Sequence, residues 1–136
     1  MRAEQGFSSF ASGRYGDVIT LLSDQPELSL RERAVLGISL LRLGQLAEAE
    51  PILLRANLQG DPEAQVEYGN LLRATGRFTE ARKHLEFILP AVQHDPDLNL
   101  RCLRWLGTAE FQSGLTEEGL KRTELVWHAY LARNDE

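Results

Sequence analysis

The side chains that most often carry chemistry are sparse in this 136-residue sequence. His84, His94 and His128 are scattered, with no histidine four residues on and no cysteine near them. Zinc sites need such ligands at close spacing, so we predict no metal site. Cys102 lies beside Leu103 in an amphipathic helical pattern with no readable Cys–His arrangement. This setting favours a buried, apolar role for the thiol over a nucleophilic one.

Other catalytic patterns are also missing. The acidic pairs Glu117/Glu118 and Asp95/Asp97 stand where helices are expected to begin, and carboxylates there stabilise the positive end of a helix. The sequence contains no dinucleotide fingerprint, phosphate-binding loop or nucleophile elbow. We therefore predict that the chain has no catalytic residues, binds no cofactor and is not an enzyme.

Arginine offers a different chemistry, the recognition of carboxylates by a planar guanidinium. The chain has 13 arginines and 2 lysines, which we interpret as the codon bias of a GC-rich bacterial genome. Its net charge is −5, whereas proteins that bind nucleic acids usually carry a basic balance. We therefore expect no nucleic-acid partner.

The composition indicates one folded domain. Hydrophobic residues make up 43% and charged residues 26% of the chain, and only five prolines occur. No apolar run approaches the roughly 20 residues that span a bilayer, and no signal-peptide pattern is evident. A lone cysteine fits a reducing compartment. We expect a cytoplasmic protein with no membrane association.

A pair of glycines seven residues apart occurs four times. The first members of the pairs lie 31, 32 and 38 residues apart, and a period in the low thirties is typical of helical solenoids. We expect the second glycine to end a helix with a left-handed backbone. The first glycine should lie inside a helix where a neighbouring helix leaves no space for a side chain. The pairs are Gly6/Gly13, Gly37/Gly44, Gly69/Gly76 and Gly107/Gly114.

Helix-start signals agree with this period. Ser29 with Glu32 forms a capping-box pattern, and Asp61 and Asp95 each precede a proline. Pro51 should be tolerated in a first turn, and Pro90 should kink or end its helix. We predict helices over residues 2–12, 14–23, 29–43, 46–58, 62–75, 78–93, 96–113 and 116–133.

The middle two units resemble the tetratricopeptide repeat (TPR) family. The family's motifs are matched by Leu36-Gly37-Leu40 with Gly44/Leu46/Ala49, and by Tyr68-Gly69-Leu72 with Gly76/Phe78/Ala81. The last unit departs from the pattern, with Glu110 in place of an apolar residue and Gly119 in place of alanine. The resemblance implies an all-α fold, an α-α superhelix (right-handed solenoid) of four antiparallel helix pairs. We expect a single domain, 1–136, with units of about 1–27, 28–60, 61–95 and 96–136.

The resemblance also implies an inner groove lined by the first helix of each pair. Arginines outnumber glutamates on the stripes that helical spacing assigns to it, which favours an acidic or carboxylate-bearing protein or peptide partner. The alternative is that these arginines are ordinary solvated surface. Only Asn70 matches the clamp by which some TPR domains hold chaperone tails. The predicted groove residues are Arg31, Val35, Ile38, Arg42, Glu67, Asn70, Arg73, Arg101, Arg104 and Thr108.

Three functions follow from this reading. The first is a protein-binding module, an adaptor or a regulatory part of a larger bacterial protein, that holds a peptide or helix in the groove. The second is self-association, as a homodimer through the terminal repeats, because the last helix carries more apolar residues than one packing face needs. Those residues are Leu120, Trp127, Tyr130 and Leu131. The third, RNA binding by helical repeats, is disfavoured by the charge.

Overall fold

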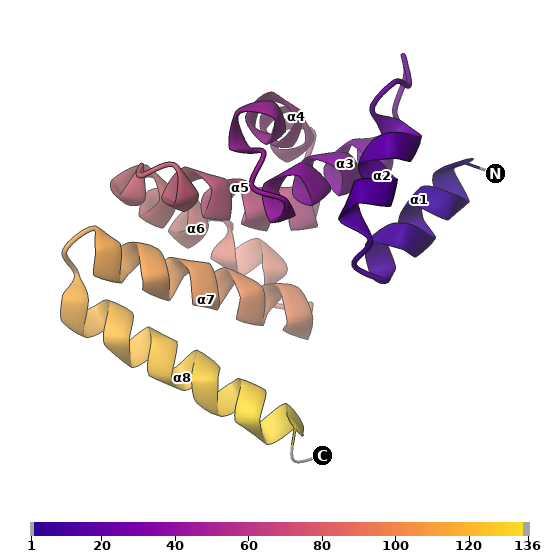
Figure 1. Ribbon diagram of the computed structural model, residues 1–136. Coiled ribbons are helices and arrows are strands. Elements are labelled where there is room, and N and C mark those ends of the chain that lie inside the picture. The colour runs from indigo at the N-terminus through magenta and orange to yellow at the C-terminus, as the bar shows by residue number, and fades with distance from the viewer. Residues whose placement is uncertain (1, 135–136) are drawn as a thin grey trace. The chain divides into compact units, whose positions relative to one another are not determined.

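The structure, a computed structural model, describes residues 2–134, and within them the chain forms eight α-helices and no strand (Figure 1). The all-α prediction is confirmed. The chain divides into two compact units, Met1–Tyr68 and Gly69–Glu136. The helices are α1 (Arg2–Ala11), α2 (Tyr15–Leu22), α3 (Leu30–Arg42), α4 (Leu46–Leu58), α5 (Pro62–Ala74), α6 (Phe78–Val92), α7 (Pro96–Gln112) and α8 (Thr116–Asn134).

Each predicted helix boundary lies within one residue of the observed one, and side-chain caps explain the starts of α3, α5 and α7. Ser29 accepts a hydrogen bond from the Glu32 amide while the Glu32 carboxylate accepts one from the Ser29 amide. Asp95 accepts hydrogen bonds from the first amides of α7. Asp61 accepts one from the Ala64 amide at the start of α5. These side chains satisfy amides that a helix start leaves without partners.

The second glycine of each pair ends a helix, as predicted. Gly13, Gly44, Gly76 and Gly114 have φ angles of 75°, 78°, 83° and 99°. This left-handed region costs a residue with a Cβ atom roughly 1–2 kcal/mol, so glycine is favoured at these turns.

The first glycine of each middle pair lies where two helices approach closely. A Cβ atom on Gly37 would come within 2.8 Å of the Leu53 side chain, and one on Gly69 would overlap the Leu85 side chain. The prediction of a close neighbour is confirmed for these two glycines and for Gly107, where a Cβ atom would lie 3.0 Å from the Thr123 hydroxyl. At Gly6 the nearest atom would be 3.4 Å away, an ordinary contact. The neighbour is the second helix of the same hairpin, so the glycine sets the spacing within each helix pair.

Two prolines lie inside helices without interrupting them, and Pro51 is tolerated as predicted. Pro51 lies in the second turn of α4, not the first, and the helix continues past it. Helix α6 likewise continues through Pro90 and ends at Val92. The longer spacing before the last glycine pair is absorbed by helix length, because α6 has 15 residues and α7 has 17, against 13 in α4 and in α5.

Each unit has its own core. In the first unit, α3 packs against α1, α2 and α4, and the residues from Ala34 to Leu41 are all buried. In the second unit, α7 packs against α6 and α8. Cys102 of α7 is fully buried and its thiol donates to the Leu85 carbonyl at 3.7 Å, so its predicted apolar role is confirmed. No helix among the described residues is long and apolar enough to cross a membrane.

Candidate functional site

In the first unit, the arginines of the predicted groove bind carboxylates of the same unit. Arg31 donates from Nη1 to Asp61 Oδ1 at 2.8 Å and from Nη2 to Glu63 Oε1 at 2.9 Å. Burial alone would lower the pKa of Arg31, but the hydrogen bonds to both acids outweigh it and raise that pKa. Arg31 therefore joins α3 to the start of α5.

Arg42 makes a two-bond contact with Glu67. Its Nη1 and Nη2 donate to Glu67 Oε1 and Oε2 at 2.9 and 2.8 Å. Glu67 is fully buried, while the Arg42 side chain keeps 28% of its surface. The hydrogen bond to Glu67 raises the pKa of Arg42 against the opposing effect of burial, and Tyr15 of α2 contributes in the same direction. The guanidinium thus connects three helices of the unit.

The apolar members of the predicted stripe belong to the core. Val35 and Ile38 are each 1% exposed, because α3 is surrounded by other helices along its middle. Among the predicted groove residues of the first unit, only Arg31 and Arg42 reach the surface. Both already contact acids, so the positive charges of these two arginines are compensated within the unit.

In the second unit, two arginines of the predicted groove, Arg73 and Arg104, both contact the ring of Trp105 in α7. The Cζ atoms of Arg73 and Arg104 lie 4.8 and 4.6 Å from the centre of the Trp105 ring. Arg73 also donates from Nε and Nη2 to the buried Asn70 Oδ1, at 3.1 and 2.9 Å. Guanidinium groups stack on indole rings by a cation–π interaction. The sequence patterns did not predict this contact, which joins residues 32 positions apart.

Arg104 differs from Arg31 and Arg42. It is exposed, and within the described part of the chain it forms no ion pair. Its backbone carbonyl accepts a hydrogen bond from the Thr108 hydroxyl at 3.0 Å, so Thr108 is engaged within its own helix. Arg101 is half-buried on the same helix. We call the group Arg73, Arg104 and Trp105 the basic surface.

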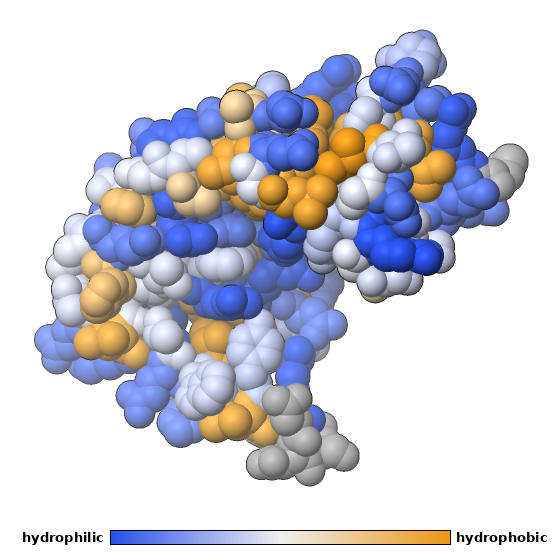
Figure 2. Space-filling view, viewed as in Figure 1, coloured by the Kyte–Doolittle hydropathy of each residue, from blue (hydrophilic) through white to orange (hydrophobic). Residues whose placement is uncertain are grey.

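A second feature of this unit lies between α7 and α8. A pocket of about 420 Å³ is lined by Arg104 together with four residues of α8, Thr123, Val126, Trp127 and Tyr130. The apolar side chains predicted to exceed one packing face are indeed at the surface, with Leu120 56% and Trp127 59% exposed. Figure 2 shows hydrophobic surface at the start of α8 and a smaller hydrophobic patch near its C-terminal end.

The departures of the fourth repeat, residues 96–136, from the TPR sequence pattern have a structural reason. Glu110 is buried and accepts a hydrogen bond from Arg122 Nε of α8 at 2.6 Å. A Cβ atom on Gly119 would lie 2.6 Å from the Phe111 backbone nitrogen and 2.7 Å from the Gly107 oxygen. An ion pair and a very close backbone approach therefore hold α7 and α8 together.

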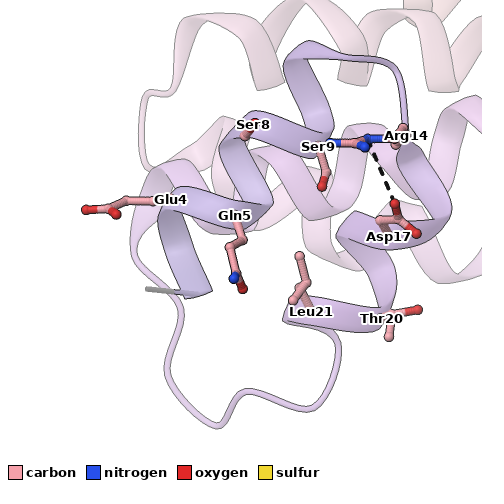
Figure 3. A pocket seen from close by; sticks show the side chains of 8 residues that line it. All are labelled: Glu4, Gln5, Ser8, Ser9, Arg14, Asp17, Thr20 and Leu21. Atoms are coloured by element: carbon pink, nitrogen blue, oxygen red, sulfur yellow. Dashed lines mark ion pairs between the residues drawn. The ribbon is translucent and has the colours of Figure 1, made fainter.

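The first unit contains another pocket, of about 550 Å³, between α1 and α2 (Figure 3). Gln5, Ser9 and Leu21 point into the space between the helices, and Arg14 pairs with Asp17 at 3.9 Å. None of the predicted groove residues lines it. Among the described residues, no cluster of three or more histidine, cysteine or acidic side chains could hold a metal ion.

These helix pairs, each with a left-handed glycine at the turn between its two helices, define a TPR-like all-α fold. A solved structure of MamA (MSR-1 C2), a TPR-containing protein, is similar to this chain with a TM-score of 0.73. The match covers 92% of this chain and 72% of that chain at 18% sequence identity, so it shows the fold alone. No protein-family model and no curated protein matches the sequence.

Proposed function

We propose that the chain is a TPR-type protein-binding module that captures an acidic or carboxylate-bearing peptide or helix of a partner protein. TPR-like folds are generally non-catalytic and serve protein interaction or scaffolding. The module would act as a cytoplasmic adaptor, or as the regulatory part of a larger bacterial protein.

The observation that carries this proposal is the exposure of Arg104 and the set of contacts that it makes. It is exposed beside Trp105 and forms no ion pair within the described residues, whereas Arg31 and Arg42 are each bound by acids. A guanidinium held by an aromatic ring is oriented in advance, so it loses less side-chain entropy when it binds a carboxylate. We therefore place the binding surface on the second unit, at the basic surface with Arg101 and Thr108 beside it. Arg31 and Arg42 then stabilise the scaffold.

A pull-down from the organism that encodes the chain tests the proposal. The variant Arg73→Glu/Arg104→Glu reverses the charge of the basic surface, and Arg104→Glu alone is the milder version. The matched control, Arg14→Glu/Arg55→Glu, makes the same change of charge on the first unit. We expect both basic-surface variants to lose captured partners while the control retains them.

Two measurements make the result decisive. Circular dichroism must show that Arg104→Glu melts close to the wild type, since this side chain is exposed. For a captured partner, raising the salt concentration should weaken binding, because exposed charge pairs are screened. Equal capture by the wild type and by both basic-surface variants would refute the proposal.

A further inference from the structure

Each residue of α8 has an equivalent in α6 at a constant separation in the sequence, because the two helices are the second helices of successive repeats. The turn glycines that precede the two helices, Gly76 and Gly114, are 38 residues apart. Both helices begin two residues after their glycine, so the offset applies along their length. Under this offset Leu85, Ile88 and Val92 of α6 correspond to Thr123, Val126 and Tyr130 of α8.

On α6, these positions are buried, and the Leu85 side chain lies against Gly69 of α5. Leu85, Ile88 and Val92 are all buried, α7 packs on α6, and the Cys102 thiol of α7 reaches the Leu85 carbonyl. On α8, the corresponding positions are more open. Thr123 is exposed and Tyr130 is half-exposed, and only Val126 is buried. Positions that are buried on α6, on which α7 packs, are therefore partly accessible on α8.

The pocket between α7 and α8 lies at this position. Its walls are Thr123, Val126 and Tyr130, the three residues in register with the buried Leu85, Ile88 and Val92 of α6, together with Trp127 and Arg104. We call these five residues the α8 face. A hollow of about 420 Å³ can receive one or two large side chains from a helix lying across it.

The residue types on the α8 face indicate a separate protein chain as the occupant. Tryptophan, tyrosine and arginine are the side chains most enriched at the energetic centres of protein interfaces. Thr123 stands where α6 has a leucine, so the contact is less apolar than the core of this chain. Arg104 favours a carboxylate on the occupant. The α8 acids Glu117 and Glu124 already pair with Lys121 and His128.

We propose that the α8 face binds an amphipathic α-helix of a protein partner, in the position that α7 takes on α6. An apolar side chain of that helix enters the pocket, and an aspartate or glutamate of the helix pairs with Arg104. The α8 face shares Arg104 with the basic surface but is built from different residues otherwise. The pairing of Arg104 with a carboxylate rests on the function proposed above, whereas the apolar contact in the pocket does not.

A displayed library of 20-residue peptides, selected on the immobilised wild-type chain, tests this proposal. We expect the enriched peptides to share apolar residues at the three- and four-residue spacing of a helix, with at least one acidic residue. Their binding should fall at least about tenfold with Trp127→Ala and with Thr123→Lys. Phe87→Ala, which truncates an exposed aromatic residue of α6, is the matched control and should change binding less than about twofold.

Folding and the shared arginine are controlled separately. Trp127 and Thr123 are exposed, so circular dichroism should show wild-type helix content in both variants. Arg73→Glu should leave peptide binding intact, which separates the α8 face from the basic surface. Enriched peptides without helical spacing, or equal binding to Thr123→Lys, would overturn the proposal. A wild-type dimer in sedimentation that Thr123→Lys dissociates would also overturn it, since the occupant would then be a second copy of this chain.

Discussion

Arg42 and Glu67 are joined by two parallel hydrogen bonds of 2.9 and 2.8 Å, which link the end of α3 to α5 within the first unit. The two residues are 25 positions apart in the sequence. The carboxylate is fully buried and the guanidinium is partly exposed. This geometry resists sliding of one helix along the other, because both bonds would break together.

Removing the guanidinium should therefore destabilise the chain strongly. Arg42→Ala takes two charge-assisted hydrogen bonds from a buried carboxylate, and we expect a loss of about 3 kcal/mol in the free energy of unfolding. Urea titration followed by circular dichroism measures it. Lys121→Ala removes an exposed partner of Glu117 and should cost less than about 1 kcal/mol. Equal effects of the two substitutions would contradict the structural role of Arg42.

The close approach of α7 and α8 predicts that Gly119 cannot be replaced by alanine. The added methyl group would meet backbone atoms of Phe111 and Gly107, which cannot rotate away as a side chain can. We expect Gly119→Ala to lower the free energy of unfolding by at least about 2 kcal/mol.

Gly16→Ala is the matched control for that substitution. Gly16 lies in α2 with open space around its missing Cβ atom, so alanine there should raise stability by up to about 1 kcal/mol. The melting temperatures of both variants, measured under the same conditions, give the comparison. A stable Gly119→Ala protein would mean that α8 lies farther from α7 than the structure shows.

The capping box at Ser29 gives a prediction about local sequence. Ser29→Ala removes the acceptor for the Glu32 amide, and it should cost about 1 kcal/mol of stability. Because Glu32 and Ser29 cap each other, the double variant Ser29→Ala/Glu32→Ala should cost less than the sum of the single variants. Strictly additive losses in thermal unfolding would show that the two bonds act independently.

Burial of Cys102 predicts both its reactivity and its effect on stability at high pH. Burial raises the pKa of the Cys102 thiol to about 12, against an ordinary value of 9.0, although the nearby Arg122 acts in the opposite direction. The thiol should therefore react slowly with a disulfide reagent such as DTNB at pH 8 until urea unfolds the chain.

The sign of the pH effect follows from the same shift. Because the pKa is higher in the folded chain than in the unfolded chain, the unfolded chain loses its thiol proton first as the pH rises. Stability should then be complete below pH 9 and should decline between pH 9 and about 12. Cys102→Ala should show a smaller decline over that interval. Rapid modification of the folded wild type at pH 8 would refute the burial of the thiol.

The sequence alone determined the helices and their ends, because those depend on local chemistry. The caps at Ser29 and Asp95 and the left-handed turn glycines act within a few residues of themselves, so their spacing could be read directly. The repeated inner glycines also predicted a close helix–helix approach, since few other pressures keep glycine inside a helix.

Only the tertiary structure decided which arginines form ion pairs within the chain. It also decided which residues of the predicted groove reach the surface. Val35 and Ile38 share a helical stripe with Arg31 and Arg42, but packing on several sides of α3 buries the apolar pair. Glu67 reaches Arg42, and Trp105 reaches Arg73, across long separations in the sequence. Such contacts depend on how side chains from distant segments meet, which no local spacing specifies.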